Sequence, residues 1–184
     1  MAKQFPALTD EQRAFIAKQH MFFVASATPD SRINLSPKGL GGFRVLGANQ
    51  VCYLDLTGSG NETAAHLQAD GRLTIMFCAF EGAPLILRLY GRARSAFRGS
   101  PEYQELLAAH FNEEPTGARQ IVVQDVDLVQ TSCGWGVPHY EYASERPSLV
   151  NWAKNKGPEG LRAYRAEKNM TSIDGLPTGL PKNT

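Results

Sequence analysis

The sequence predicts a mainly β protein, an antiparallel β-barrel with helices packed around it. Strand-like segments dominate the middle of the chain, and most are rich in β-branched or aromatic residues and end at Gly, Pro, Asn or Asp. They cover residues 21–27, 32–36, 51–56, 73–80, 84–97 and 120–129. These segments follow one another too closely for parallel βαβ crossovers, which need about a dozen or more residues. The length of 184 residues fits one domain.

Helical patterns flank these strands. Helices are predicted at residues 9–19, 62–69, 101–111, 147–157 and 158–169. Thr9 can cap the first helix, and Gln12 completes a capping box with it. Ser100 is the expected cap of the third helix, with Pro101 at its first position. The last two helices are separated by Gly and Pro and precede an irregular tail, so the chain changes character in its last quarter.

The composition excludes several classes of function. A net charge of +1, from 19 basic and 18 acidic residues, provides no global field for nucleic acid or an anionic membrane. The N-terminus has no apolar signal region, and no apolar run approaches the length of a membrane span. An odd number of cysteines without a C-x-x-C pattern favours a reducing cytoplasm over a disulfide framework. The four histidines have no metal-ligand spacing, so no protein-built metal site is expected.

The segment DLTGSGNETAAHL, residues 55–67, joins a strand to a short helix and has two interpretations. In the structural one, Ser59 and Glu62 form a capping box, and the glycines supply unusual backbone angles. In the functional one, the free N–H groups and positive dipole end of the helix bind an anion. The hydroxyl or amide groups of Thr57, Ser59, Asn61 and Thr63 would then add neutral donors. The segment matches neither a dinucleotide-binding fingerprint nor a P-loop.

Two further strands carry polar residues that could meet a ligand. Asn34 and Ser36 share one face of their strand, and Lys38 follows at the start of a glycine-rich loop. This pattern fits either a solvated edge strand or a polar strand end that contacts a ligand. Arg88 lies in the apolar strand 84–97, where an unpaired charge is costly, so it needs a carboxylate or an anionic ligand.

The segment TSCGWGVPHY, residues 131–140, contains three residues of chemical interest. Trp135 could stack on an aromatic ligand or fill the core, and core filling is the more common role. Cys133 and His139 invite a nucleophile and base hypothesis. No third orienting residue accompanies them, so a coincidental pairing is favoured.

The order of these segments resembles the pyridoxamine 5'-phosphate oxidase-like superfamily of FMN-binding split barrels. The resemblance covers roughly residues 12–140 and rests on the blocks MFFVASA, RINLSPKG, VCYLDLTGSGNETAAHL, RLTIMFCAF and LILRLYGRA. It implies a split β-barrel domain over residues 1–140 and a helical C-terminal extension over residues 141–184 that packs on the same domain. It also implies a homodimer with two FMN molecules at the subunit interface. The later blocks DVDLVQTSCGWGVPHYEY and NMTSIDGLP resemble one particular branch of the superfamily.

The resemblance assigns roles to individual residues. The strand with Asn34, Ser36 and Lys38 would lie along the flavin ring and ribityl chain. Arg88 would face the cofactor, and Trp135 would close over the flavin from the other subunit. The phosphate would be held by the loop that contains Thr57, Ser59, Gly60, Asn61 and Thr63.

Two departures from the biosynthetic oxidases bear on the activity. Those oxidases have adjacent Arg and Lys at the phosphate loop, where this chain has Asn61, Glu62 and Thr63. Helix N–H groups, hydroxyls and Arg88 or Arg72 would have to replace them. The chain also lacks the Arg-x-His pair that those oxidases use for substrate.

The resemblance therefore implies a flavin-dependent oxidoreductase for another small molecule, with NAD(P)H or oxygen completing the cycle. The alternative is a carrier or sensor of flavin, deazaflavin or heme, in which His66 or His139 would be the axial ligand for heme.

Overall fold

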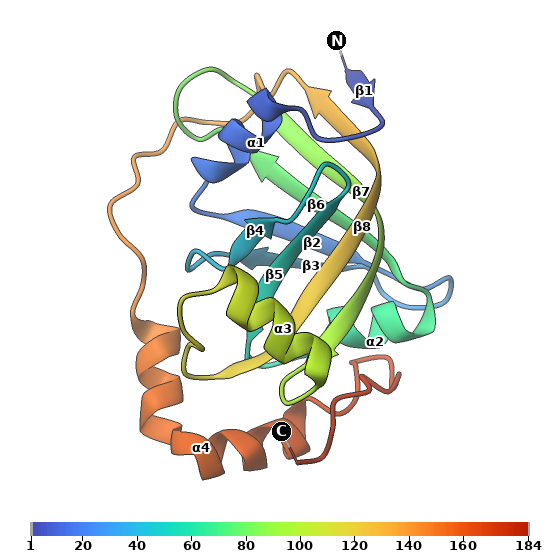
Figure 1. Cartoon of the computed structure of the whole chain (residues 1–184), viewed down its shortest axis with the longest axis vertical. Coiled ribbons are helices and arrows are strands. Elements are labelled where there is room, and N and C mark those ends of the chain that lie inside the picture. Colours follow the sequence, from blue (N-terminus) through green and yellow to red (C-terminus); the bar gives the residue numbers. More distant parts are fainter. Residues whose placement is uncertain (1, 184) are drawn as a thin grey trace.

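The computed structural model describes residues 2–183 (Figure 1). The elements in chain order are β1 (Lys3–Phe5), α1 (Asp10–Ala17), β2 (Phe22–Ser26), β3 (Asn34–Lys38), β4 (Phe43–Val45), β5 (Gln50–Leu56), α2 (Glu62–Ala69), β6 (Arg72–Cys78), β7 (Ile86–Phe97), α3 (Pro101–His110), β8 (Ala118–Ser132) and α4 (Ser148–Lys168). No helix within the described residues is long and apolar enough to cross a membrane.

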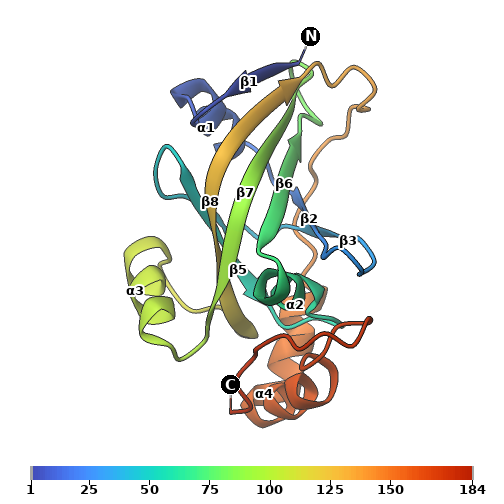
Figure 2. The same cartoon turned by 90° about the vertical axis from the view of Figure 1, so that its right-hand side faces the viewer.

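All strands belong to one antiparallel sheet that curls into a half-barrel (Figures 1 and 2). The strand order is β3-β2-β6-β7-β8-β5-β4, and β1 pairs with β8 beside this path. Because β3 and β4 are the two ends of this order and do not pair, the barrel is open on that side. The predicted mainly β, antiparallel fold with flanking helices is confirmed.

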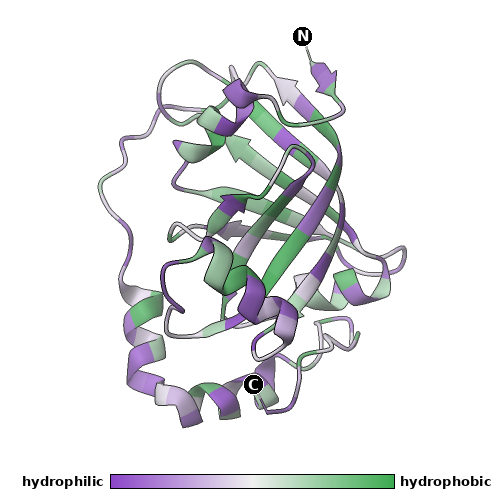
Figure 3. Ribbon diagram, in the orientation of Figure 1, coloured by the Kyte–Doolittle hydropathy of each residue, from purple (hydrophilic) through white to green (hydrophobic). Residues whose placement is uncertain are grey.

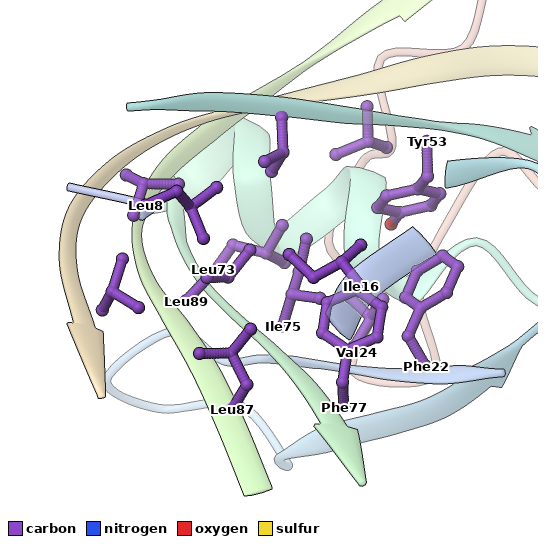
Figure 4. Packing of buried hydrophobic residues seen from close by; sticks show 14 of the residues in the cluster. Leu8, Ile16, Phe22, Val24, Tyr53, Leu73, Ile75, Phe77, Leu87 and Leu89 are labelled. Atoms are coloured by element: carbon purple, nitrogen blue, oxygen red, sulfur yellow. The ribbon is translucent and has the colours of Figure 1, made fainter. Parts of the chain in front are cut away.

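The two faces of the sheet bury separate clusters of apolar side chains. The larger cluster fills the inside of the curl, and Figure 4 shows Phe22, Tyr53, Ile75 and Leu89 within it. The smaller cluster lies under α3 and includes Tyr103. Strands β5 and β8 contribute alternate residues to the two clusters, so β5 and the middle of β8 are apolar on both faces, while the rest of β8 also carries polar residues (Figure 3).

Strands β7 and β8 form a long hairpin-like pair with an irregularity at Tyr90 and Gly91. A Cβ atom added to Gly91 would lie 1.9 Å from the backbone oxygen of Asp125. Only glycine allows so close an approach of the two strands. Gly91 is therefore required by the register of this pair.

The predicted helix boundaries agree with the structure. Thr9 and Gln12 form the expected capping box of α1. The hydroxyl of Ser100 accepts a hydrogen bond from the N–H of Tyr103 at the start of α3. Within α4, Gly157 has a φ of 65° and is not helical, so this element consists of two helices, as predicted.

The strands differ from the prediction at their ends. The segment predicted at 32–36 forms a strand two residues later, and Pro37 lies inside β3 instead of ending it. An edge strand tolerates proline because the position without an N–H can face away from its one neighbour. The strands β1 and β4 were not predicted, because three residues are too few for a pattern.

Candidate functional site

A cavity of about 1160 Å³ lies where β3, the end of β5 and the start of α2 meet. Seven of the ten residues that the sequence assigns to a cofactor line it: Asn34, Ser36, Lys38, Ser59, Gly60, Asn61 and Thr63. The tertiary structure thus joins β3 to residues 57–63, here called the 57–63 loop, although β4 and β5 separate them in the sequence.

The polar face of β3 is linked to the first turn of α2 by hydrogen bonds. Asn34 Nδ2 donates to Thr63 Oγ1 at 3.1 Å, and Ser36 Oγ donates to Asn34 Oδ1 at 3.1 Å. These bonds orient the side chains that face the cavity. The strand face is therefore a preorganised polar wall and not only a solvated edge.

Asp55 is the centre of a buried ionic cluster below this wall. Its Oδ1 lies 2.6 Å from Lys38 Nζ, and its Oδ2 lies 2.8 Å from Arg119 Nε and 2.9 Å from Gln120 Nε2. Burial by itself would raise the pKa of Asp55, but the charges and hydrogen bonds of Arg119 and Lys38 hold this pKa well below its usual value. Asp55 is therefore ionised and fixes Lys38 at the cavity.

The start of α2 differs from the predicted capping box. The helix begins at Glu62, and its N-cap is Asn61, whose side chain makes no capping hydrogen bond. The box between Ser59 and Glu62 is wrong, because Glu62 Oε2 instead accepts a hydrogen bond from the N–H of Ile173 at 3.0 Å. The C-terminal tail therefore binds the carboxylate that would otherwise cap the helix.

The glycines of the 57–63 loop do not have the expected unusual backbone angles, since neither Gly58 nor Gly60 is among the residues with positive φ. Their role is to leave space. A Cβ atom on Gly58 would meet nothing within 4 Å, and one on Gly60 would lie 3.2 Å from Glu62 Oε1. Both glycines line the cavity, so the loop backbone is accessible from it.

Two carbonyl groups of the loop accept hydrogen bonds from side chains of β8 and of the residue after α4, and one of these side chains, Arg119, also lines the cavity. Asn169 Nδ2 donates to the oxygen of Gly58 at 3.0 Å, and an Arg119 nitrogen donates to the oxygen of Gly60 at 2.8 Å. Thr57 is buried and does not line the cavity. Its hydroxyl donates to the oxygen of Gly117 and accepts from Arg165 at 2.9 Å.

The donors that remain at this site fit a phosphate group. The first N–H groups of a helix have no partner within the helix, and they carry the positive end of its dipole. Among residues 2–183, the buried Nδ2 of Asn61 has no acceptor, while its Oδ1 accepts from Gln120 at 2.9 Å. The hydroxyls of Ser59 and Thr63 line the same cavity. This donor set would accommodate an anion, and the carboxylate nearest to it, that of Glu62, is bound by the N–H of Ile173.

The arginines proposed as substitutes for the missing Arg-Lys pair lie elsewhere. Arg88 is half-buried on β7 and donates to Ser132 Oγ at 3.0 Å, and Arg72 is paired with Asp70. Neither lines the cavity. Within one chain, neither arginine is placed at the 57–63 loop, and a contact of Arg88 with a cofactor stays a prediction.

The aromatic and nucleophilic candidates also lie outside the cavity. Trp135 is 83% exposed, so it does not fill the core of this chain. Cys133 and His139 are exposed. His66 is buried, and its Nδ1 lies 3.0 Å from Ser26 Oγ. The described residues contain no group of three His, Cys, Asp or Glu side chains arranged for a metal ion.

Several residues of the site were missed by sequence reasoning. They are Asp55, Arg119, Gln120, Arg165 and Asn169. The one available signal was an acidic residue inside an apolar strand at position 55, which requires a buried partner. The partners come from β8 and α4, and nothing in their local patterns connects them to the 57–63 loop.

A second cavity, of about 1300 Å³, adjoins the first. The two share Pro37, Lys38, Gly39, Leu40, Glu145 and Leu149. Residues 133–147, which connect β8 to α4 along the side of the molecule (Figure 1), form part of its wall. The ring of Tyr142 in this connection stacks on His20 with ring centroids 3.6 Å apart.

Comparisons with known proteins agree on one family. The family model described as pyridoxamine 5'-phosphate oxidase matches residues 8–133, more than half of the chain. A curated protein from Aspergillus flavus, the pyridoxamine 5'-phosphate oxidase family protein ustO, is 37% identical over 191 aligned positions. That alignment covers 94% of this chain and 76% of the relative.

Solved structures show the same fold at lower identity. A Lactobacillus delbrueckii protein, named as a candidate pyridoxamine 5'-phosphate oxidase, superposes with a TM-score of 0.52 at 17% identity and covers 68% of this chain and 94% of its own. The protein HupZ from Group A Streptococcus gives a TM-score of 0.51 at 19% identity, over 66% of this chain and 91% of its own.

Proposed function

Because the chain belongs to the pyridoxamine 5'-phosphate oxidase family, we propose that it binds FMN in the first cavity and acts as a flavin-dependent oxidoreductase on a small molecule. NAD(P)H or oxygen would complete the catalytic cycle. The observation that carries this proposal is the meeting of β3 and the 57–63 loop in one cavity. The resemblance of the sequence to the family assigned these two segments to one cofactor.

The phosphate of FMN would be bound by the first turn of α2. The free N–H groups at the start of this helix would donate hydrogen bonds to the phosphate oxygens. A phosphate oxygen would also be the acceptor that Asn61 Nδ2 lacks. Ser59 and Thr63 would add hydroxyl donors, and the small Gly60 would allow the phosphate to approach the backbone.

The flavin ring and ribityl chain would lie along β3. FMN, when bound, supplies hydride transfer at its ring system. Ser36 and Asn34 would donate or accept hydrogen bonds along it, in the orientation that Thr63 already imposes on Asn34. Lys38 would donate to the ring while Asp55 holds its ammonium group in place.

The substrate is proposed to differ from pyridoxamine phosphate, because the chain has no Arg-x-His pair. The second cavity supports this proposal, since it shares residues 37–40 with the first and could hold an organic molecule beside the ring. Its wall combines aromatic side chains with carboxylates, including Tyr140, Tyr142, Glu81 and Glu145.

We propose a homodimer, with FMN at the interface between two chains. In it, residues 1–140 would be the FMN-binding domain and residues 141–184 its helical extension. Trp135, which is exposed in one chain, would cover the flavin of the partner, and Arg88 would contact the cofactor from the same interface. A cytoplasmic location would suit the free cysteines.

The experiment is an absorbance spectrum of the purified protein, followed by mass identification of the molecule released on denaturation. We expect a flavin spectrum, FMN in the released fraction and bleaching by NADPH or NADH without oxygen. Gly60→Leu should lose FMN, because the side chain would occupy the cavity, while Gly47→Leu, at an open position outside both cavities, should retain it. A flavin spectrum that no reductant changes would favour the carrier or sensor. A Soret band, or no FMN retained by the wild type, would overturn the proposal.

A further inference from the structure

The C-terminal segment, residues 165–180, lies against the 57–63 loop and α2 (Figure 2). It follows the residues that the family model matches, which end at 133. It includes the block NMTSIDGLP, to which the sequence assigned no role. The contacts of this segment give it one.

Two side chains of the segment are buried beneath the loop. Arg165 is 4% exposed and donates to Thr57 Oγ1 at 2.9 Å. Asn169 is fully buried and donates to the carbonyl oxygen of Gly58, while its Oδ1 accepts from Arg119 at 3.0 Å. Together with Arg119, they bind the loop from below at Thr57, Gly58 and Gly60.

The segment is itself held in one conformation. Thr178 Oγ1 donates to the oxygen of Asn169 at 2.7 Å, and the N–H of Ser172 donates to the oxygen of Leu176 at 2.8 Å. At its far end, Asp174 accepts hydrogen bonds from Arg32, next to β3, and the N–H of Ile173 binds Glu62. The segment thus connects both walls of the proposed FMN site.

This arrangement has two consequences for an anion. Because the carbonyls of Gly58 and Gly60 are hydrogen-bonded to Asn169 and Arg119, the loop is held in one conformation, with Gly58 and Gly60 lining the cavity. The guanidinium group of Arg165 places positive charge beneath the loop, since arginine remains charged in proteins, whereas the charge of Arg119 is paired with Asp55. Burial, together with repulsion from three neighbouring arginines, lowers the pKa of Arg165. Those neighbours are Arg98, Arg119 and Arg162.

We propose that Arg165 and Asn169 are positioning residues for the phosphate of FMN, and that the C-terminal segment gives this chain its preference for FMN over riboflavin. In this role they replace the Arg-Lys pair that the 57–63 loop lacks. They act through the loop and do not line the cavity. The inference rests on the proposed function, because it requires a flavin in the first cavity.

The test compares the Kd of FMN with the Kd of riboflavin, both measured by quenching of flavin fluorescence on the apoprotein and its variants. Arg165→Gln and Asn169→Ala should weaken FMN about two- to tenfold, the effect of losing the hydrogen bond that each side chain donates to the loop. Riboflavin, which has no phosphate, should bind as it does to the wild type. The matched control is Lys154→Gln, which removes one exposed positive charge from the same helix.

If Arg165→Gln or Asn169→Ala does not fold, Asp174→Asn is tested in its place. This substitution removes the negative charge that pairs with Arg32 at the end of the segment. It should weaken FMN several-fold and leave riboflavin unchanged. Equal losses for both flavins, or no loss for either, would overturn the inference while leaving FMN binding by the wild type intact. A wild type that binds FMN and riboflavin equally would also overturn it. A wild type that binds neither flavin would instead refute the proposed function.

Discussion

The buried cluster around Asp55 allows a quantitative prediction of stability. We expect Asp55→Asn to be strongly destabilising although the side chains have nearly the same shape. All three partners of Asp55, namely Lys38, Arg119 and Gln120, are hydrogen-bond donors. An asparagine must therefore direct its own N–H₂ group at one of these donors. In addition, the buried Arg119 side chain, which is 4% exposed, loses its negative partner.

The magnitude follows from this burial. Removing one member of a buried ion pair costs about 3–5 kcal/mol, because the remaining charge is left without compensation. For a domain of this size the loss corresponds to a fall in Tm of roughly 6–20 °C. Lys38→Met should cost less, since Lys38 is partly exposed and Asp55 keeps Arg119 and Gln120.

The assay is urea unfolding of the apoprotein at pH 7, followed by far-UV circular dichroism, for the wild type and both variants. The native pKa of Asp55 lies below that of an unfolded aspartate, about 3.9. Its ionisation therefore stabilises the fold at neutral pH, and this contribution declines as the pH falls below about 4. The difference in free energy of unfolding between the wild type and Asp55→Asn should therefore become smaller as the pH falls below about 4. A cost of less than about 1 kcal/mol at pH 7, or a larger cost for Lys38→Met, would refute this account of the cluster.

Two further predictions concern the backbone and the cysteines. Gly91→Ala should lower the free energy of unfolding by at least about 2 kcal/mol in the same assay, because its methyl group would meet the backbone of Asp125. Gly136→Ala, at an open position, should leave it unchanged. Equal effects of the two substitutions would contradict the assigned register of β7 and β8. With a thiol reagent at pH 8, the exposed Cys133 should react rapidly, and burial, which raises the pKa of Cys52 to about 12, should keep that thiol unreactive until the protein unfolds. Rapid labelling that persists in Cys133→Ser would count against this assignment.

The fold and much of the site could be read from local patterns. Strand periodicity and the short distances between strands predicted an antiparallel sheet, and all its long strands are present. The capping signals of Thr9 and Ser100 also predicted the starts of their helices, because a cap depends on residues within one turn. The polar residues of β3 and the 57–63 loop were identified for a similar reason, since each group lies within a few consecutive positions.

Local patterns failed where a distant group competed for the same atom. Ser59 and Glu62 have the spacing of a capping box, yet Glu62 binds the N–H of Ile173. The competing partner lies far away in the sequence, and no short-range pattern indicates it.

By itself, the sequence determined which residues could form strands, helix starts and polar faces, because these depend on side-chain periodicity and on neighbours within one turn. Only the tertiary structure decided which charges support the 57–63 loop. Arg119 and Arg165 reach it from β8 and α4, and Asn169 joins them beneath Gly58. A buried charge must find its partner wherever the folded chain brings one, so its role is defined by packing and not by its position in the sequence.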